Sequence, residues 1–252
     1  MPRFAANLSL LFTEHPFLER FRAAAGAGFR FVEYQNPYDF DRHAVGAALR
    51  DAGLAAVLHN LPLQTRGACD PDRREEFRAG VALAIEYAHA GGCRQLNCLP
   101  GGVPEGVGPE LARATLVANL RHAARALKDA GIRLLIEPVN TRDLPGSYLN
   151  RTRQAAGIID EVGSDNLFVQ YDAYHMQIME GDLARTIEEN LAKIAHIQVS
   201  DNPGRHEPGT GEINFPFLFA FLDRIGYAGF VGAEYRPAGG TLEGLGWVRP
   251  WL

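Results

Sequence analysis

Acidic and amide side chains occur at the ends of four apolar segments in the second half of the sequence. They are Glu137, Asp172, Gln198 and Glu234. A short apolar run that is bounded by polar or turn residues is typical of a buried parallel strand. The carboxyl ends of parallel strands meet at one side of a sheet or barrel, so we expect these four side chains to lie together.

Three carboxylates that are packed together repel one another, and a cation is needed to neutralise them. Hard oxygen ligands without a thiolate suit Mg²⁺ or Mn²⁺ better than a structural zinc. The alternative is that these carboxylates are buried in ion pairs with arginine. Four such residues at four successive strand ends favour the metal, and we predict one divalent cation with an acid–base pair beside it.

Such a site has a definite chemistry. A divalent cation can chelate a carbonyl oxygen and the neighbouring hydroxyl of a substrate, which polarises the adjacent C–H bond and stabilises an enediolate. One glutamate would then remove the proton, and the same or another glutamate would return it to the neighbouring carbon. Aldose–ketose isomerisation and ketose epimerisation both follow from this arrangement.

Three polar residues near strand ends are candidates for binding the substrate. His175 lies three residues after Asp172, where it either binds a substrate oxygen beside the metal or has a capping or packing role. His59 ends the third expected strand and either binds substrate or hydrogen-bonds a loop. Asn97, in the fourth expected strand, is the third candidate.

Loop arginines are candidates to hold an anionic group of the substrate. Arg66, Arg142 and Arg205 are expected in loops at the rim of the site, and we select Arg205 as the substrate-binding candidate. His196 differs from the other candidates, because it lies two residues before Gln198. Strand alternation puts it on the same side of the strand, one layer deeper, so we expect a structural role.

The elements that must position these residues alternate between strand and helix. Strands are expected at 3–8, 29–34, 54–58, 95–99, 134–137, 168–172, 196–201 and 230–234, and helices at 16–27, 41–52, 73–90, 109–130, 152–162, 182–191 and 214–225. A short helix and coil are expected after the last strand. Eight such units in about 250 residues predict a (β/α)₈ TIM barrel, a single α/β domain over residues 1–252. A doubly wound sheet would need a Gly-rich turn after the first strand, and Asn7-Leu8-Ser9 does not supply one.

Composition limits the partners and the compartment. The formal net charge of -5 gives no global attraction to nucleic acid or to acidic membranes. Three cysteines without a C-x-x-C pair indicate a reducing compartment. No signal-like N-terminus or membrane-length apolar run is found, so we expect a soluble, cytoplasmic protein. Trp247 and Trp251 are candidates either for a contact in a homo-oligomer or for packing on the barrel.

Several segments are specific when they occur together and in order. They include Ile136-Glu137-Pro138-Val139-Asn140, Gln170-Tyr171-Asp172-Ala173-Tyr174-His175-Met176-Gln177 and Glu207-Pro208-Gly209-Thr210-Gly211-Glu212-Ile213-Asn214. In these segments, and over nearly the whole chain, the sequence resembles the hydroxypyruvate isomerase family of xylose-isomerase-like TIM barrels.

The resemblance implies roles for particular residues. Glu137 and Glu234 would be the proton donor and acceptor, and the metal ligands would be Glu137, Asp172, Gln198 and Glu234. The implied reaction converts hydroxypyruvate into 2-hydroxy-3-oxopropanoate (tartronate semialdehyde). The segments after Pro62 and after Leu99 are shorter than is usual in that family, and both should reach the site. Isomerisation of a 2-oxo-tetronate or 3-epimerisation of a ketose by the same residues therefore stays open.

Two other classes of function fit less well. Abasic-site endonucleases of the endonuclease IV type share this barrel, but they need more histidines at strand ends, where this chain has Asn97 and Gln198. The acidic net charge also argues against a nucleic-acid partner. A non-catalytic binding protein would hold a small acid without exchanging its C–H proton with solvent. We therefore expect a small hydroxy-oxo acid or a sugar as substrate.

Overall fold

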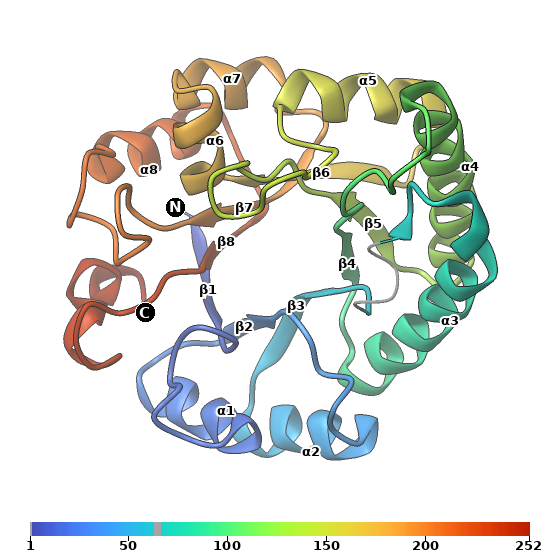
Figure 1. The fold of residues 1–252 in the computed structure, drawn as a ribbon. Coiled ribbons are helices and arrows are strands. Elements are labelled where there is room, and N and C mark those ends of the chain that lie inside the picture. Colours follow the sequence, from blue (N-terminus) through green and yellow to red (C-terminus); the bar gives the residue numbers. More distant parts are fainter. Residues whose placement is uncertain (1, 63–66) are drawn as a thin grey trace.

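The computed structural model describes residues 2–62 and 67–252, and it contains a closed barrel of eight parallel strands in sequence order (Figure 1). The strands are β1 (Arg3–Asn7), β2 (Phe31–Tyr34), β3 (Ala55–Asn60), β4 (Gln95–Cys98), β5 (Arg133–Ile136), β6 (Leu167–Asp172), β7 (Ile194–Val199) and β8 (Phe230–Ala233). Strand β8 pairs with β1 and closes the barrel. The (β/α)₈ TIM-barrel fold is thus confirmed.

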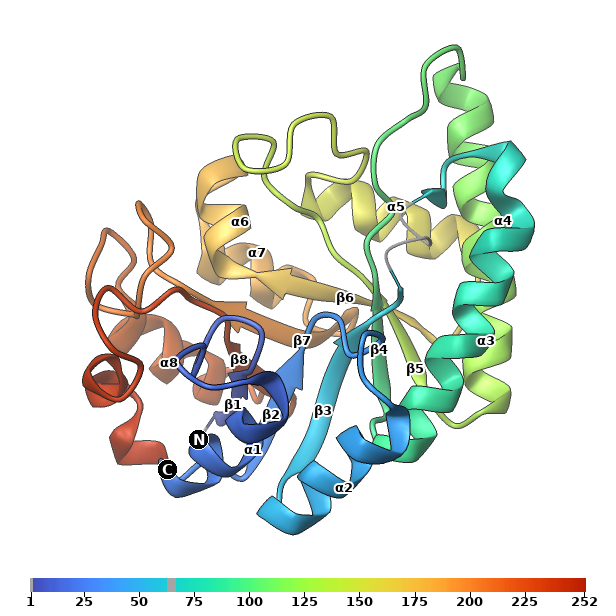
Figure 2. The same cartoon turned by 60° about the horizontal axis from the view of Figure 1, so that its bottom comes forward.

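Helices surround the barrel on the outside, and long loops gather at the carboxyl ends of the strands (Figures 1 and 2). The helices are α1 (Phe17–Gly26), α2 (Arg42–Ala52), α3 (Arg74–Gly91), α4 (Pro109–Asp129), α5 (Thr152–Val162), α6 (Ala173–Met179), α7 (Leu183–Glu189) and α8 (Phe215–Arg224). Local capping sets several of their ends. The Asp41 carboxylate accepts hydrogen bonds from two backbone N–H groups at the start of α2, and Gly53 ends that helix with a left-handed φ of 67°.

Strand alternation divides the inside of the barrel into an apolar end and a polar end. Ala5, Val57, Leu58, Leu135 and Ala195 form a buried apolar cluster. The residue two positions after Leu135 points to the same side of its strand and is Glu137. This apolar cluster therefore lies below the carboxyl ends of the strands, where polar side chains such as Glu137 gather.

The chain after β8 forms two short 3₁₀ helices, η3 (Glu243–Trp247) and η4 (Arg249–Trp251). Trp247 and Trp251 both lie with their ring centres 5.3 Å from that of Phe4, and both lie 5.7 Å from that of Phe219. Of the two roles considered for these tryptophans, the structure shows packing on the barrel of their own chain.

Helices α6 and α7 differ most from the sequence prediction. The sequence does not predict helix α6, because seven residues are too few to show a helical period. In the structure the Asp172 carboxylate also accepts a hydrogen bond of 2.8 Å from the backbone N–H of Tyr174 and caps α6. Helix α7 begins one residue later and ends two residues earlier than predicted. No helix in the described part of the chain is long and apolar enough to span a membrane.

Candidate functional site

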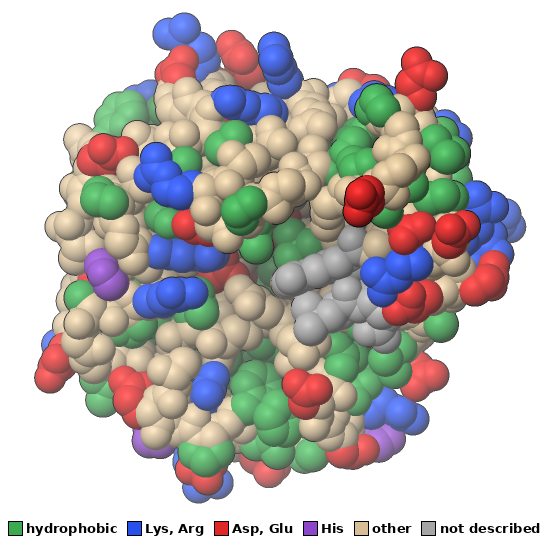
Figure 3. All heavy atoms as spheres, in the orientation of Figure 1, with side chains coloured by type: hydrophobic (Ala, Val, Ile, Leu, Met, Phe, Trp, Pro, Cys, Tyr) green, Lys and Arg blue, Asp and Glu red, His purple; other side chains and the backbone are tan. Residues whose placement is uncertain are grey.

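A cavity of about 510 Å³ opens among the loops at the carboxyl ends of the strands. This volume suits a small molecule. Figure 3 shows acidic atoms in a central hollow of this face, with basic side chains beside them. Four of the predicted site residues line the cavity: Glu137, His175, Arg205 and Glu234. The other four, Asp172, Gln198, His59 and Asn97, are at most 1% exposed.

Glu137, Asp172 and His175 form the most compact part of the site. One ligand atom from each lies within 4.8 Å of the others, so the three could hold a metal ion. The His175 Nε2 atom is 3.5 Å from Asp172 Oδ2 and 3.9 Å from Glu137 Oε1. Asn97 Nδ2 donates a hydrogen bond of 2.7 Å to Glu137 Oε2 and thereby orients that carboxylate.

Glu234 faces this group from β8. Its Oε1 accepts hydrogen bonds from Gln35 Nε2 at 2.7 Å and from Asn7 Nδ2 at 3.1 Å. Its Oε2 lies 2.7 Å from Arg205 Nη2, and that nitrogen is also 3.7 Å from Asp172 Oδ2. Arg205 therefore supplies positive charge to the carboxylates.

Burial and mutual repulsion raise the pKa values of these carboxyl groups. Burial raises the pKa of Glu137 well above its usual value, and the neighbouring Glu234 and Asp172 raise it further. Burial also raises the pKa values of Asp172 and Glu234, although Arg205 opposes both shifts. A carboxyl group with a raised pKa is suited to accept and return a proton near neutral pH.

The donor set fits a divalent cation. Asp172 Oδ2 is buried and accepts no hydrogen bond from any described residue. A buried carboxylate oxygen of this kind, close to a second carboxylate, calls for a positive partner. Arg205 meets only part of this need, because it is 3.7 Å away.

Gln198 is held by a second polar layer directly below the cavity. Its Nε2 donates to Glu33 Oε1 at 2.7 Å, and its Oε1 accepts from Gln170 Nε2 at 2.6 Å. Glu33 Oε2 lies 2.6 Å from His196 Nε2. His196 is fully buried, as expected for a structural histidine.

Glu33 is a buried acidic residue of this polar layer that the sequence does not single out. It is 0% exposed and also accepts a hydrogen bond of 2.9 Å from Asn7 Nδ2. A signal was present, because Glu33 ends a short apolar segment in the same way as Glu137.

Gly232 makes room for the Glu33 carboxylate. A Cβ atom at position 232 would lie 2.3 to 2.5 Å from the three carboxylate atoms of Glu33. That carboxylate is buried and has three hydrogen-bond partners, so it cannot move aside easily. We therefore expect Gly232→Ala to lower the free energy of unfolding by about 1–3 kcal/mol, measured by chemical denaturation. Gly157→Ala, at a position in α5 with open space around it, is the matched control and should stabilise the helix by about 0.5–1 kcal/mol. Equal effects of the two substitutions would contradict this packing argument.

His59 lies below the cavity floor rather than in it. Its Nδ1 contacts Tyr38 Oη at 3.2 Å and the Asn60 carbonyl oxygen at 3.0 Å, and its buried Nε2 has no hydrogen-bond partner among the described residues. Burial lowers the pKa of His59 to about 4 from its usual 6.5.

A histidine with a lowered pKa stabilises the fold above its unfolded pKa, and this contribution is lost as the pH falls toward the folded value. Between pH 6.5 and 4, His59 takes up a proton in the unfolded chain but not in the folded protein. The unfolding free energy should therefore fall by roughly 3 kcal/mol, at about 1.4 kcal/mol per pH unit. We expect His59→Gln to flatten the fall of unfolding free energy over this range, measured by urea titration. His43→Gln, at an exposed position, should leave the slope unchanged. Parallel curves for wild type and His59→Gln would be inconsistent with the expected effect.

The three loop arginines have different positions. Arg205 reaches the carboxylates, Arg142 is exposed, and Arg66 lies outside the described residues. Asn97 contacts Glu137 and does not line the cavity.

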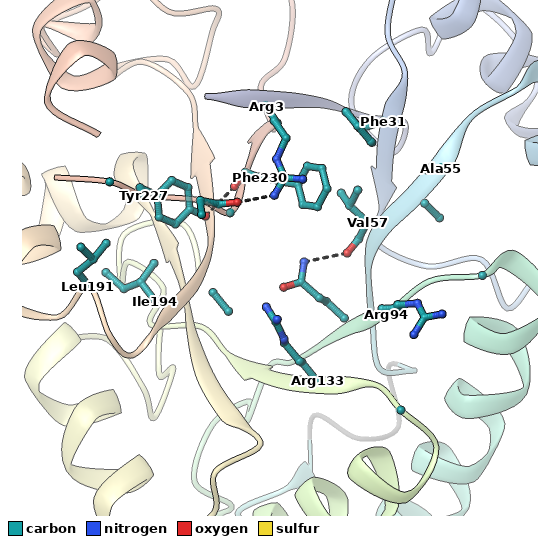
Figure 4. A pocket seen from close by; sticks show the side chains of 18 residues that line it. Arg3, Phe31, Ala55, Val57, Arg94, Arg133, Leu191, Ile194, Tyr227 and Phe230 are labelled. Atoms are coloured by element: carbon teal, nitrogen blue, oxygen red, sulfur yellow. Dashed lines mark hydrogen bonds between the residues drawn. The ribbon is translucent and has the colours of Figure 1, made fainter. Parts of the chain in front are cut away.

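Another cavity, of about 740 Å³, opens at the N-terminal mouth of the barrel (Figure 4). Arg133 points into it, and the Arg3 guanidinium lies 4.1 Å from the ring centre of Phe230. None of the described residues that line this cavity is acidic. The cluster of buried carboxyl groups therefore lies at the other end of the barrel.

Comparison with known proteins agrees with this geometry. The model of the family "Xylose isomerase-like TIM barrel" matches residues 21–251. The chain is 51% identical to the hydroxypyruvate isomerase of Escherichia coli (strain K12), with 100% of both chains covered. It is 45% identical to a 2-oxo-tetronate isomerase of Cupriavidus necator, covering 100% of this chain and 99% of the relative.

A solved structure is also similar to this chain in both sequence and fold. The crystal structure described as AP endonuclease, family 2, from Brucella melitensis has a TM-score of 0.95 and 45% sequence identity, covering 100% of this chain and 99% of that one. The chain therefore belongs to the xylose isomerase-like TIM barrel family. The identity to curated isomerases extends over the full length. The protein is an isomerase, of the kind represented by hydroxypyruvate isomerase and 2-oxo-tetronate isomerase.

Proposed function

We propose that this isomerase interconverts hydroxypyruvate and 2-hydroxy-3-oxopropanoate by proton transfer between Glu137, Glu234 and the substrate. The observation that carries the proposal is that both glutamates line the same small cavity and each has a raised pKa. The 51% identity to a hydroxypyruvate isomerase favours this substrate.

In the proposed reaction, one glutamate removes a proton from C3 of hydroxypyruvate, and a proton is delivered to C2 of the resulting enediolate by the other or the same glutamate. The hydroxyl proton on the C3 oxygen is lost, and the C2 oxygen gains one, so the atoms balance. The Arg205 guanidinium is proposed to bind the substrate carboxylate, and His175 to bind a substrate oxygen.

We propose Glu137, Asp172, Gln198 and Glu234 as the ligands of the divalent cation, Mg²⁺ or Mn²⁺. When bound, the cation would supply positive charge that stabilises the enediolate. Asn97 and His59 are proposed to act from below the cavity, Asn97 by orienting the Glu137 carboxylate.

The test is a substrate comparison in D₂O with Mg²⁺ or Mn²⁺ present, followed by NMR. Hydroxypyruvate should be converted into 2-hydroxy-3-oxopropanoate that carries deuterium at C2. Absence of both turnover and exchange would reject the proposal. Included in the same comparison are a 2-oxo-tetronate and free ketoses, which are the substrates of the alternative functions.

A 2-oxo-tetronate isomerase is the second candidate, because relatives of that name are 40–45% identical to this chain. A kcat/KM at least tenfold higher for the 2-oxo-tetronate would favour it over the first. Since a similar structure bears an endonuclease name, an abasic DNA duplex is a necessary control, and we expect no cleavage.

Two further properties are proposed. Residues 1–252 act as one domain, supported by the pairing of β1 with β8 and by the packing of the C-terminal tryptophans on Phe4. A cytoplasmic location is supported by three free, buried cysteines. Light scattering would test whether the protein is a homo-oligomer.

A further inference from the structure

The loop after β5 holds a buried amide whose orientation is fixed by its neighbours. Asn140 is 0% exposed. Its Oδ1 accepts hydrogen bonds from the backbone N–H groups of Arg142 at 3.0 Å and Asp143 at 2.7 Å. Only an oxygen can accept these bonds, so the Nδ2 group must be on the other side of the amide.

That Nδ2 group has two partners. It lies 3.1 Å from Asp143 Oδ2 and 2.6 Å from His175 Nδ1. Because the amide nitrogen is a donor, His175 Nδ1 must accept and can carry no proton. The ring proton is then on Nε2, the atom that faces Asp172 and Glu137.

We propose that Asn140 is a positioning residue that holds His175 as the Nε2–H tautomer, which makes His175 a hydrogen-bond donor to a substrate oxygen and not a metal ligand. The inference deepens the proposed function and rests on it for the role of the substrate. The distances alone would also allow His175 to ligate a metal together with Glu137 and Asp172. The tautomer decides between that role and the role of a hydrogen-bond donor to the substrate. A nitrogen that carries a proton has no lone pair to offer a cation.

Asp143 fixes the Asn140 amide by accepting a hydrogen bond from its Nδ2 group. The Tyr174 hydroxyl donates a hydrogen bond of 2.9 Å to the same Asp143 Oδ2 that receives the Asn140 amide. The Tyr174 ring in turn lies 5.2 Å from the guanidinium carbon of Arg205. A chain of contacts thus runs from Arg205 through Tyr174, Asp143 and Asn140 to His175 along one wall of the cavity.

The turn geometry alone does not explain an amide at position 140. An aspartate could accept the same two backbone N–H bonds, but its second oxygen would face His175 Nδ1 as an acceptor. The ring would then carry its proton on Nδ1 and present a lone pair at Nε2. The choice between Asn and Asp at this position therefore selects the tautomer.

The double variant Asn140→Asp/Asp143→Asn tests this directly, because it exchanges the two groups and keeps the charge. The new amide at 143 can donate to the carboxylate at 140 and to the Tyr174 oxygen, so the turn is retained. Asp143→Asn alone leaves Asn140 in place and is the matched control.

The first readout is the tautomer, observed by ¹H–¹⁵N NMR of histidine-labelled, metal-free protein, with the His175 signal assigned by its loss in His175→Gln. We expect Nε2–H in wild type and in Asp143→Asn, and Nδ1–H in the double variant. An Nδ1–H tautomer in wild type would overturn the proposal, and this comparison needs no variant other than the His175→Gln protein used for the assignment.

The second readout is Mn²⁺ affinity, measured by calorimetry without substrate. We expect His175→Gln to change it by less than threefold in wild type, but to lower it at least tenfold in the double variant, where Nε2 has a lone pair. A tenfold loss in the wild-type background would show that His175 is a ligand and would refute the proposal.

The third readout is kinetic. The double variant should lose about 10- to 100-fold in kcat/KM for hydroxypyruvate, the effect of one hydrogen bond to a charged group, and Asp143→Asn should lose less. If wild type has the Nε2–H tautomer and passes the metal test but does not isomerise hydroxypyruvate, the proposed function fails and the positioning role of Asn140 stands.

Discussion

Glu137→Gln and Glu234→Gln should each lower kcat for hydroxypyruvate by about 10²–10⁴-fold, the range that positioned proton transfer contributes. Glutamine keeps the shape of the side chain and can still accept from Asn97 Nδ2 at position 137 or from Gln35 Nε2 at position 234. It cannot take up and return a proton. The fold should therefore be preserved while the chemistry is lost.

Deuterium exchange distinguishes the roles of the two glutamates. The variant that lacks the base should neither turn over hydroxypyruvate nor exchange its C3 hydrogens. The variant that lacks the second proton-transfer group should retain exchange without forming product. Glu105→Gln, in an exposed loop on the same face of the barrel, is the control and should keep full activity. Retention of more than a tenth of wild-type kcat by both site variants would exclude a glutamate pair as the proton carriers.

Glu33→Gln is expected to weaken Mg²⁺ or Mn²⁺ binding by about 10- to 100-fold, as is usual when a group that orients a metal ligand is removed. Glu33 accepts hydrogen bonds from Gln198 Nε2 and Asn7 Nδ2 on the same oxygen, Oε1. A glutamine has a single oxygen, so it can keep both bonds only with its amide nitrogen facing His196 Nε2, which would then have to accept. The negative charge that Glu33 contributes near Asp172 and Glu234 would also be lost.

Calorimetric titration of the metal-free protein measures this effect without substrate. Glu161→Gln, which removes a half-exposed carboxylate paired with Arg113 on the outside of the barrel, is the control and should bind the cation as wild type does. An affinity within threefold of wild type for a folded Glu33→Gln protein would show that Gln198 is not oriented by Glu33, or is not a ligand.

Much of the barrel could be predicted from local patterns, because each strand and helix carries its own signal. Apolar runs closed by polar residues predict the strands, and Gly53 after a periodic segment marks a helix end. Helix α5 was predicted with its observed bounds, Thr152–Val162. Helix α6 is not predicted, because its seven residues make only two turns. It also follows β6 directly, and its N-cap residue is the last residue of that strand.

The sequence alone also predicts which acidic residues point into the barrel, because side chains alternate with a period of two within each strand. Glu137 and Glu234 could be assigned to the carboxyl ends of β5 and β8 without knowledge of any neighbour, and both line the cavity. The hydrogen-bond partners of each polar group could not be predicted in this way. Glu33 meets Gln198 and His196 across 165 and 163 residues, and Asn140 meets His175 across 35. Whether an amide presents its oxygen or its nitrogen, and which imidazole nitrogen bears the proton, depends on which strands and loops the closed barrel brings to within 3 Å, and no pattern along the sequence encodes that distance.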